Sequence, residues 1–417
     1  ENNVFQLVVQ YGAGEREFPK LGYAAQLMNN AGIMGAYEPQ ELKEELSKLN
    51  ATCHVTADDD NLYIIMEGYE ATLPQACQLL SRQILMPKLD EKQLARLKGS
   101  AMGMRQQRKD NVSILNEALR QYMLYGEKSD YIKELTDKEI YELQISELTG
   151  DINRASNYEA KVFFTGTLPF DQVYDILSKN LPLVANERPS NSPQAKDMMP
   201  VTENTVYFLP NNDAEQAQIH LYIPMQKADK KDDVLRSAFN QYFGLDFTGI
   251  VLNEIREKRS MAYTAYAFVG TQGIAGKASY LRGYIGTQND KANDALDVLM
   301  GLVNDMPKNP ERIDNIKSYL RQAMLTSHPS FRNKAMELVD LGYRGYTDDP
   351  AKENLPKVDA LTFDDIVKFY EENIKDKPYC ISIMGNPKNI DLKRLEKFGK
   401  VVKLNERKLF NTKDALF

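Results

Sequence analysis

The stretch Met86-Pro87-Lys88 decides how the chain is divided, because the same three residues return 220 positions later as Met306-Pro307-Lys308. Self-similarity at a fixed offset indicates repeated structural units. Other pairs lie at nearly the same offset, each in the same kind of predicted element. They are Leu97-Lys98 with Ile316-Lys317 (offset 219), Gly126 with Gly345 (219), the strand 161–166 with the strand 380–385 (219), and Leu135-Thr136 with Leu361-Thr362 (226). We therefore predict two homologous domains, each about half of the 417 residues.

A linker is predicted between the two copies at residues 186–200. It begins with Asn186-Glu187-Arg188-Pro189-Ser190-Asn191-Ser192-Pro193, which is rich in Pro, Ser and Asn and lacks an apolar period. The first domain is thus predicted at 1–185 and the second at 201–417, with a strand at 205–209 near its start. Because residues 4–9 already have the pattern of a strand, we expect that one or two N-terminal strands of the first domain are missing from this chain.

Both copies show the same order of predicted elements. In the first copy a strand at 62–68 is followed by a helix at 73–85 with apolar residues at helical spacing. In the second copy, strands within 263–287 precede a helix at 292–303. Strands that pair locally and are followed by a block of helices indicate an α+β fold, with a mixed or antiparallel sheet packed against helices in each domain.

The composition is that of an ordinary globular protein. Hydrophobic residues make up 42% and charged residues 27%, which excludes wholesale disorder, and the net charge of -7 makes nucleic acid an unexpected partner. No apolar run reaches the roughly 18 residues that a membrane span needs, so no span is predicted. The three cysteines, Cys53, Cys77 and Cys380, are too scattered for a disulfide framework and are expected to be small buried hydrophobes.

No catalytic constellation is recognisable in the residues themselves. The only histidines are His54, His220 and His328, and none has a second His or a Glu at the spacing of metal ligands. We therefore expect neither a metal site nor a catalytic residue in this chain. The cluster Asp58-Asp59-Asp60 lacks the later Gly and Glu of a calcium loop, so a solvated turn is predicted there. The glycines at 270, 273 and 276 lie between strands and predict a hairpin turn.

Residues 247–266 (FTGIVLNEIREKRSMAYTAY) hold the densest group of functional candidates. Apolar residues at 250, 251 and 255 predict a helix that ends near Ser260 and is followed by a strand. Arg256 would lie late on that helix and Tyr263 would open the strand. This placement could aim a guanidinium and a phenol at one spot, where both donate hydrogen bonds to a carbonyl or an oxyanion. The alternative is that Arg256 belongs to a solvated charge run and Tyr263 is a core aromatic residue.

The two runs Glu254-Ile255-Arg256-Glu257 and Met261-Ala262-Tyr263-Thr264 resemble a characteristic stretch of the insulinase/pitrilysin family of zinc metallopeptidases, the inverzincins. The similarity extends over most of the chain and includes Leu361-Thr362, Asp365-Ile366 and the strand 381–385. Members of that family consist of paired α+β domains, two in each half-molecule. The internal repeat indicates the same organisation independently.

In that family one half carries HxxEH and a downstream Glu, which bind zinc, and the other half contributes an R-x6-Y pair. The helix at the equivalent position here, within residues 21–32, contains neither His nor Glu. The resemblance therefore implies a non-catalytic, C-terminal-type half whose first domain is the inactive counterpart of a zinc-binding domain. It implies that Arg256 and Tyr263 hold the substrate backbone and support the tetrahedral intermediate. Zinc is then expected in the partner half and not in this chain.

The resemblance implies the substrate-binding half of a zinc metalloendopeptidase that completes a closed, peptide-degrading chamber. Its partners would be an HxxEH-bearing half, fused or separate, and peptide substrates. An inert scaffold similar to the core subunits of the respiratory cytochrome bc1 complex is an alternative, and the retained Arg256–Tyr263 pair argues against it. A stand-alone peptide-binding module is a third hypothesis. The compartment stays open, although bacterial family members are often exported, which favours the periplasm.

Overall fold

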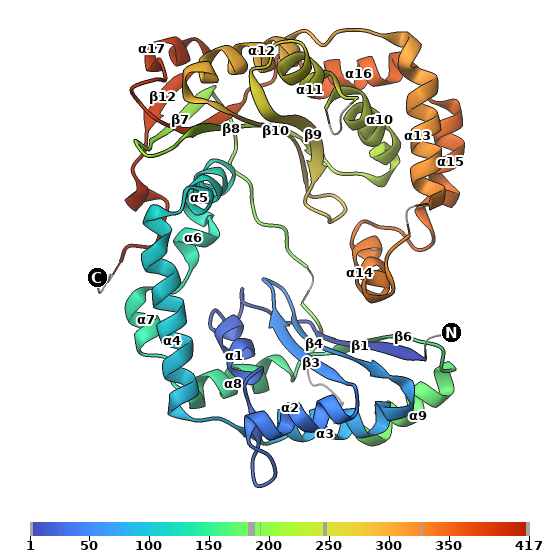
Figure 1. The fold of residues 1–417 in the computed structure, drawn as a ribbon. Coiled ribbons are helices and arrows are strands. Elements are labelled where there is room, and N and C mark those ends of the chain that lie inside the picture. Colours follow the sequence, from blue (N-terminus) through green and yellow to red (C-terminus); the bar gives the residue numbers. More distant parts are fainter. Residues whose placement is uncertain (1–2, 182–187, 192, 245–247, 327, 414–417) are drawn as a thin grey trace.

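The computed structural model describes residues 3–181, 188–191, 193–244, 248–326 and 328–413. It consists of two α+β domains that face each other, with an extended segment running between them (Figure 1). The predicted fold class, with helices packed on mixed or antiparallel sheets, is confirmed. Parts of the predicted boundary, residues 182–187 and 192, lie outside the described residues, as does Phe247.

The first domain contains an antiparallel sheet with the strand order β3-β4-β1-β6. Alternate residues of β4, such as Leu62, Ile64 and Met66, enter the main core of this domain, as expected for a strand with one face on helices. The strands are β1 (Val4–Tyr11), β3 (Thr52–Ala57), β4 (Leu62–Tyr69) and β6 (Ala160–Thr165), and β2 (Gly32–Ile33) pairs separately with β5 (Pro87–Lys88). The main helices are α1 (Leu21–Met28), α2 (Pro39–Lys48), α3 (Leu73–Leu85), α4 (Glu91–Gln106), α5 (Val112–Tyr125), α7 (Asp137–Tyr141), α8 (Ile145–Ala155) and α9 (Phe170–Asn180), with the short α6 (Asp130–Lys133).

The second domain contains a six-stranded mixed sheet with the order β12-β7-β11-β8-β10-β9. One face packs on helices and forms the largest core of the chain. The strands are β7 (Thr205–Pro210), β8 (Gln216–Lys227), β9 (Ala262–Thr271), β10 (Ala278–Gln288), β11 (Cys380–Gly385) and β12 (Lys400–Lys403). The helices are α10 (Asp233–Phe243), α11 (Ile250–Leu252), α12 (Ala292–Asn304), α13 (Ile313–Thr326), α14 (Lys334–Tyr343), α15 (Pro350–Ala360), α16 (Phe363–Asn373) and α17 (Leu392–Leu395).

The repeat is visible in the sheets, because the order β3-β4-β1-β6 returns as β9-β10-β8-β11. The two Met-Pro-Lys stretches follow the equivalent helices α3 and α12. Gly126 and Gly345 follow α5 and α14 with φ of 57° and 84°, a region that favours glycine. Thr136 and Thr362 each cap a helix, α7 and α16, as predicted. The two helices are not equivalent, however, because α16 directly precedes β11 whereas α8, and not α7, directly precedes β6.

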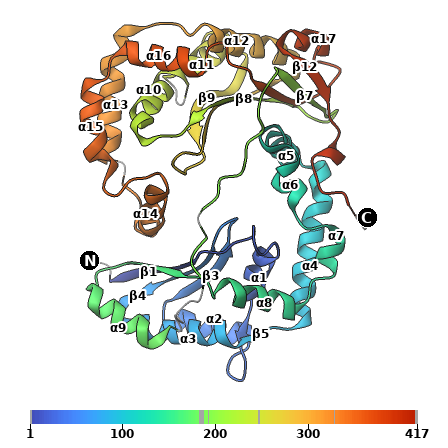
Figure 2. The same cartoon turned by 180° about the vertical axis from the view of Figure 1, so that it is seen from behind.

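Each domain has one helix that packs on the sheet of the other domain. Leu115, Ala118 and Leu119 of α5 pack against residues of β7, β11 and the C-terminal segment, on the face of the second sheet opposite the helical core. In return, Ala335 and Met336 of α14 pack on the corresponding face of the first sheet. Figures 1 and 2 show these helices at opposite sides of the molecule. The two domains are therefore connected through packed helices as well as through the chain between them.

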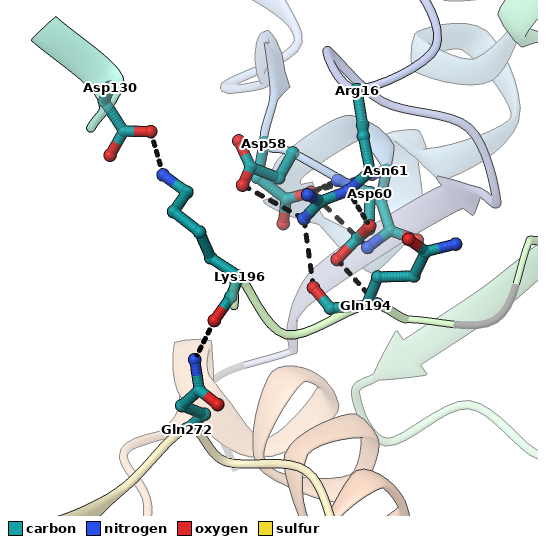
Figure 3. A network of polar contacts seen from close by, with 9 residues as sticks. Arg16, Asp58, Asp60, Asn61, Asp130, Gln194, Lys196 and Gln272 are labelled. Atoms are coloured by element: carbon teal, nitrogen blue, oxygen red, sulfur yellow. Dashed lines mark hydrogen bonds and ion pairs between the residues drawn. The ribbon is translucent and has the colours of Figure 1, made fainter. Parts of the chain in front are cut away.

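The segment between the domains is fixed by polar contacts to both (Figure 3). Arg16 forms ion pairs with Asp59 and Asp60 and donates a hydrogen bond to the Gln194 carbonyl at 3.0 Å. The Gln194 N–H in turn donates to the Asp60 carboxylate. Thus the predicted solvated turn at residues 58–60 also anchors this segment. On the other side, Gln272 donates to the carbonyl of Lys196 at 2.5 Å.

All three cysteines lie within the described residues. Cys77 and Cys380 are buried and Cys53 is half-buried, and all three are free thiols. Burial raises the pKa of the Cys77 thiol to about 12 and that of Cys380 to about 11, which makes their thiolates scarce at neutral pH. Among the described helices, none combines the length and apolar character that a bilayer crossing requires.

Candidate functional site

Arg256 lies in an irregular helical turn. After the single turn of α11, residues Asn253–Glu257 form a π-helical turn, in which the Lys258 N–H donates to the Asn253 carbonyl at 2.9 Å. The side chain of Ile255 is fully buried and fixes this turn to the core. Arg256, the next residue, consequently points away from the core and is 36% exposed. Single π-helical turns are rare and often occur at functional sites.

Tyr263 lies at a second irregularity, near the start of β9. The register between β9 and β10 changes by one residue from the pair Gly286–Thr264 to the pair Thr287–Ala262, which leaves Tyr263 as the extra residue of a β-bulge. Ser260, just before the strand, has a φ of 49°. A bulge re-aims the side chain that it carries. As a result Tyr263 is 77% exposed, so the alternative of a core aromatic residue is wrong.

The two irregularities bring Arg256 and Tyr263 together. The guanidinium carbon of Arg256 lies 5.3 Å from the centre of the Tyr263 ring, which is a cation–π contact. The neighbouring cations Lys258 and Arg259 bind Glu254, and these hydrogen bonds lower the pKa of its carboxyl group. Apart from Tyr263, Arg256 has among the described residues a single side-chain contact, a long one of 3.5 Å with Glu257. The pair thus presents two hydrogen-bond donors at the surface, with most of their capacity available for a ligand.

A row of aromatic residues, which sequence reasoning missed, follows the pair on the face of the second sheet that carries α5. We name it the aromatic row: Phe268 and Tyr266 on β9, Tyr284 on β10 and His220 on β8. Neighbouring ring centres are 5.9 Å (Phe268–Tyr266), 5.2 Å (Tyr266–Tyr284) and 5.1 Å (Tyr284–His220) apart. The signal was present in the sequence, because Tyr266 and Phe268 alternate with small or apolar residues that enter the core.

The electrostatics around the aromatic row are set by two arginines. His220 is buried, and its Nε2 lies 3.0 Å from Asn116 Oδ1. Burial first, and then the positive charges of Arg282 and Arg120, lower the pKa of His220 to about 3. The imidazole is therefore neutral at physiological pH, and positive charge on this face comes from the arginines.

The first domain does not offer zinc ligands at the position that the family resemblance indicates. The helix α1, which lies at that position, contains neither His nor Glu. Throughout the described part of the chain, no group of three or more His, Cys, Asp and Glu residues could hold a metal ion. The residues present do not fit zinc, and we derive no chemical step through a metal in this chain.

The chain was compared with known protein families and with solved structures. Residues 156–320 match the family model described as the peptidase M16 inactive domain, a range that includes both Arg256 and Tyr263. This confirms the resemblance to a non-catalytic half of an insulinase-type peptidase. No curated protein matches the chain significantly.

Solved structures show the same fold at low sequence identity. The peptidase M16 inactive domain from Pseudomonas fluorescens has a TM-score of 0.73 and 17% identity, over 94% of each chain. The periplasmic protease PqqL from Escherichia coli has a TM-score of 0.71 and 13% identity, over 93% of this chain and 43% of that protein. The ferredoxin protease FusC, solved in complex with Arabidopsis ferredoxin, has a TM-score of 0.74 and 12% identity, over 92% of this chain and 42% of that protein. The chain therefore spans less than half of PqqL and of FusC.

Proposed function

Because residues 156–320 match the model of the peptidase M16 inactive domain, we propose that the chain is the substrate-binding half of a zinc-dependent metalloendopeptidase. In this proposal an HxxEH-bearing half, fused or separate, supplies the zinc and the catalytic groups. The two halves enclose a chamber in which peptides are degraded. The finding that this chain spans less than half of two proteases of the same fold supports the division into halves.

One observation carries the proposal: Arg256 and Tyr263 are presented side by side, exposed, by a π-helical turn and a β-bulge. Backbone irregularities of this kind are retained where the surrounding structure enforces them, and they concentrate at functional sites. A scaffold needs neither irregularity. We assign the pair to the substrate: the guanidinium and the phenol donate hydrogen bonds to the peptide carbonyl oxygens next to the bond that the partner half cleaves.

The chemistry that this chain supplies is then positioning and charge stabilisation. When zinc is bound in the partner half it lowers the pKa of a water molecule and polarises the scissile carbonyl. Arg256 and Tyr263 orient the substrate backbone and place positive or hydrogen-bonding groups near the developing oxyanion. Donors of this kind contribute roughly 10²–10³ in rate for each group.

The proposal is tested by hydrolysis of a quenched fluorescent peptide library in the presence of zinc. The chain is assayed alone and with an HxxEH half, added in trans or fused. We expect cleavage only when both halves are present, and a strong reduction by Arg256→Ala. If a fully assembled pair cleaves no peptide, the proposal is wrong and the chain is better explained as an inert scaffold. Cleavage by this chain alone would show that it holds a catalytic site of its own.

A further inference from the structure

We propose that the aromatic-row face of the second sheet binds a carboxylate of the peptide substrate, with Arg282 as its ion-pair partner. The side chain that adjoins this carboxylate packs on Tyr266 and Phe268. The inference rests on the proposed function, since it names the class of peptide that this half receives: an acidic or C-terminal segment next to an apolar or aromatic residue.

Within the part of the chain that the structure describes, Arg282 is a cation without a hydrogen-bond or ion-pair partner. It lies on β10 directly opposite Phe268 of β9, and its side chain is half-buried. Among the described residues none forms a hydrogen bond or an ion pair with it, and its Nε is buried without an acceptor. An unsatisfied buried donor is costly, and more so when it is charged. A carboxylate matches the planar guanidinium with two parallel hydrogen bonds and would satisfy these donors.

The charges that face Arg282 leave this surface positive. From α5, Arg120 binds Glu117 through Nε at 2.7 Å and through a second contact from Nη2. Arg282 acts on the same carboxylate only through its field. His220 of β8, which lies on the same face, is neutral because its pKa is low. Glu117 is thus paired with Arg120, and Arg282 keeps its positive charge without a bound carboxylate. Charge complementarity therefore selects an anionic ligand.

The aromatic row adds selectivity for what lies beside the carboxylate. Tyr266 and Phe268 are half-buried, and their partly exposed faces adjoin Arg282 through the opposed pair Arg282–Phe268. The ring of Tyr284 is fixed because its hydroxyl donates to Gln218. Rigid aromatic surfaces of this kind bind apolar and aromatic side chains at little cost in conformational entropy. The face therefore suits a peptide in which an apolar residue neighbours the carboxylate.

The length of β9 predicts how far along the substrate the carboxylate lies from the cleaved bond. Tyr263 and Phe268 are five residues apart on β9, which corresponds to roughly 17 Å at the usual rise of a strand. An extended peptide that contacts the Arg256–Tyr263 pair reaches Arg282 after about five residues. The carboxylate can belong to an Asp or Glu side chain at that place or to the C-terminus of a short peptide. Both present the same group to Arg282.

The experiment measures binding to this chain without any hydrolysis. Three fluorescent peptides are compared by anisotropy: one with Glu five residues from the central bond and an amidated C-terminus, its Gln counterpart, and a shorter peptide that ends there in a free carboxylate. We expect the Glu peptide, the free-carboxylate peptide or both to bind about 10-fold more tightly than the Gln peptide, as for a hydrogen-bonded ion pair. The Glu and C-terminal arms identify the source of the carboxylate.

Variants decide whether Arg282 is responsible. Arg282→Gln should abolish the preference, and Arg282→Lys, which keeps the charge, should retain part of it. Lys277→Gln, which removes an exposed cation from the turn of the same hairpin, should leave the preference unchanged. Equal binding of all three peptides, a preference that persists in Arg282→Gln, or no binding at millimolar peptide would overturn the inference. Failure of hydrolysis with an HxxEH half would instead overturn the proposed function, whatever the binding result.

Discussion

The side-chain amide of Asn240 makes both hydrogen bonds that a neighbouring strand would make with Val269. The Val269 N–H donates to Asn240 Oδ1 at 2.6 Å, and Asn240 Nδ2 donates to the Val269 carbonyl at 3.0 Å. In the first domain Asn29 binds Val55 in the same way, at 2.7 and 2.9 Å. Val269 and Val55 lie in the edge strands β9 and β3. In each domain an asparagine amide thus binds the backbone of one edge strand, β9 in the second and β3 in the first.

These amides should stabilise the fold measurably. Asn240→Ala leaves a donor and an acceptor of Val269 without partners, so we expect the free energy of unfolding to fall by about 1–3 kcal/mol in urea titrations. Asn29→Ala should act similarly. The matched control is Asn30→Ala, which removes an exposed side chain that donates to the Gln26 carbonyl. Its effect should stay within about 0.5 kcal/mol. Equal effects of Asn240→Ala and Asn30→Ala would contradict a role for the edge contact.

Tyr263 should matter for activity and not for stability. In the assembled enzyme we expect Tyr263→Phe to lower kcat/KM by roughly 10²–10³, because the hydroxyl is one donor to the oxyanion. The thermal unfolding midpoint should not change, since the side chain is largely exposed. Tyr319→Phe, another exposed tyrosine, is the control and should leave both quantities unchanged. A loss of stability in parallel with activity would indicate a structural role.

Arg256 should not tolerate replacement by lysine. The planar guanidinium contacts the face of the Tyr263 ring and offers a fork of donors, whereas an ammonium group is a point charge. We expect Arg256→Lys to recover only part of the activity that Arg256→Ala loses, measured as kcat/KM in the assembled enzyme. Lys258→Arg changes a neighbouring cation that binds Glu254 and should have no effect. Full activity of Arg256→Lys would show that only the charge is needed.

The buried His220 predicts a loss of stability in acid. Its pKa is lowered to about 3 in the native state from an ordinary value of 6.5. Between these values the unfolded chain binds a proton that the native state does not, so the free energy of unfolding decreases as pH falls from about 6.5 towards 3. We expect thermal unfolding of His220→Gln to depend less on pH in this window than that of the wild type. His328→Gln, at an exposed site, is the control, and parallel curves for all three proteins would refute the assignment.

The contact of α14 with the first sheet should be a weak point. Ala335 is buried against Val8 and Tyr63 within a small cluster, and the nearby ion pair of Arg332 with Glu67 is exposed, which limits its contribution. We expect Ala335→Glu to detach the helix, because a charge cannot remain in this contact. Amide hydrogen exchange in residues 334–343 should become about 10-fold faster or more. Leu338→Glu, on the exposed side of the helix, should leave exchange unchanged.

Much of the fold could be predicted from local patterns. The period of apolar residues located α3 and α12, because it reports which side of a helix is buried, and a strand-length apolar run after a turn located β4. The placement of α5 and α14 on the opposite domains could not be predicted in this way. It depends on which of two similar apolar sheet faces a helix meets, and periodicity carries no information about its partner.

The candidate site, like the fold, could be predicted only in part. Arg256 and Tyr263 could be singled out by residue type and spacing within a predicted helix–strand boundary. The π-helical turn and the bulge that expose them leave no periodic trace, since each inserts one residue into an otherwise regular element. Arg282 was not predicted, because a lone arginine in a strand is unremarkable until the structure shows that its neighbours do not bind it.

Because α5 and α14 each pack on the sheet of the other domain, cleavage of the linker should not separate the two domains. A single break between Pro193 and Met198 cuts the covalent path of the linker, but α5 still covers the second sheet and α14 still lies on the first. The two fragments should therefore stay together and elute from gel filtration at the mass of the intact chain until denaturant is added. Each fragment alone would expose the apolar face that its missing helix covers, so complementation of fragments, and not autonomous refolding, is the behaviour expected of this protein.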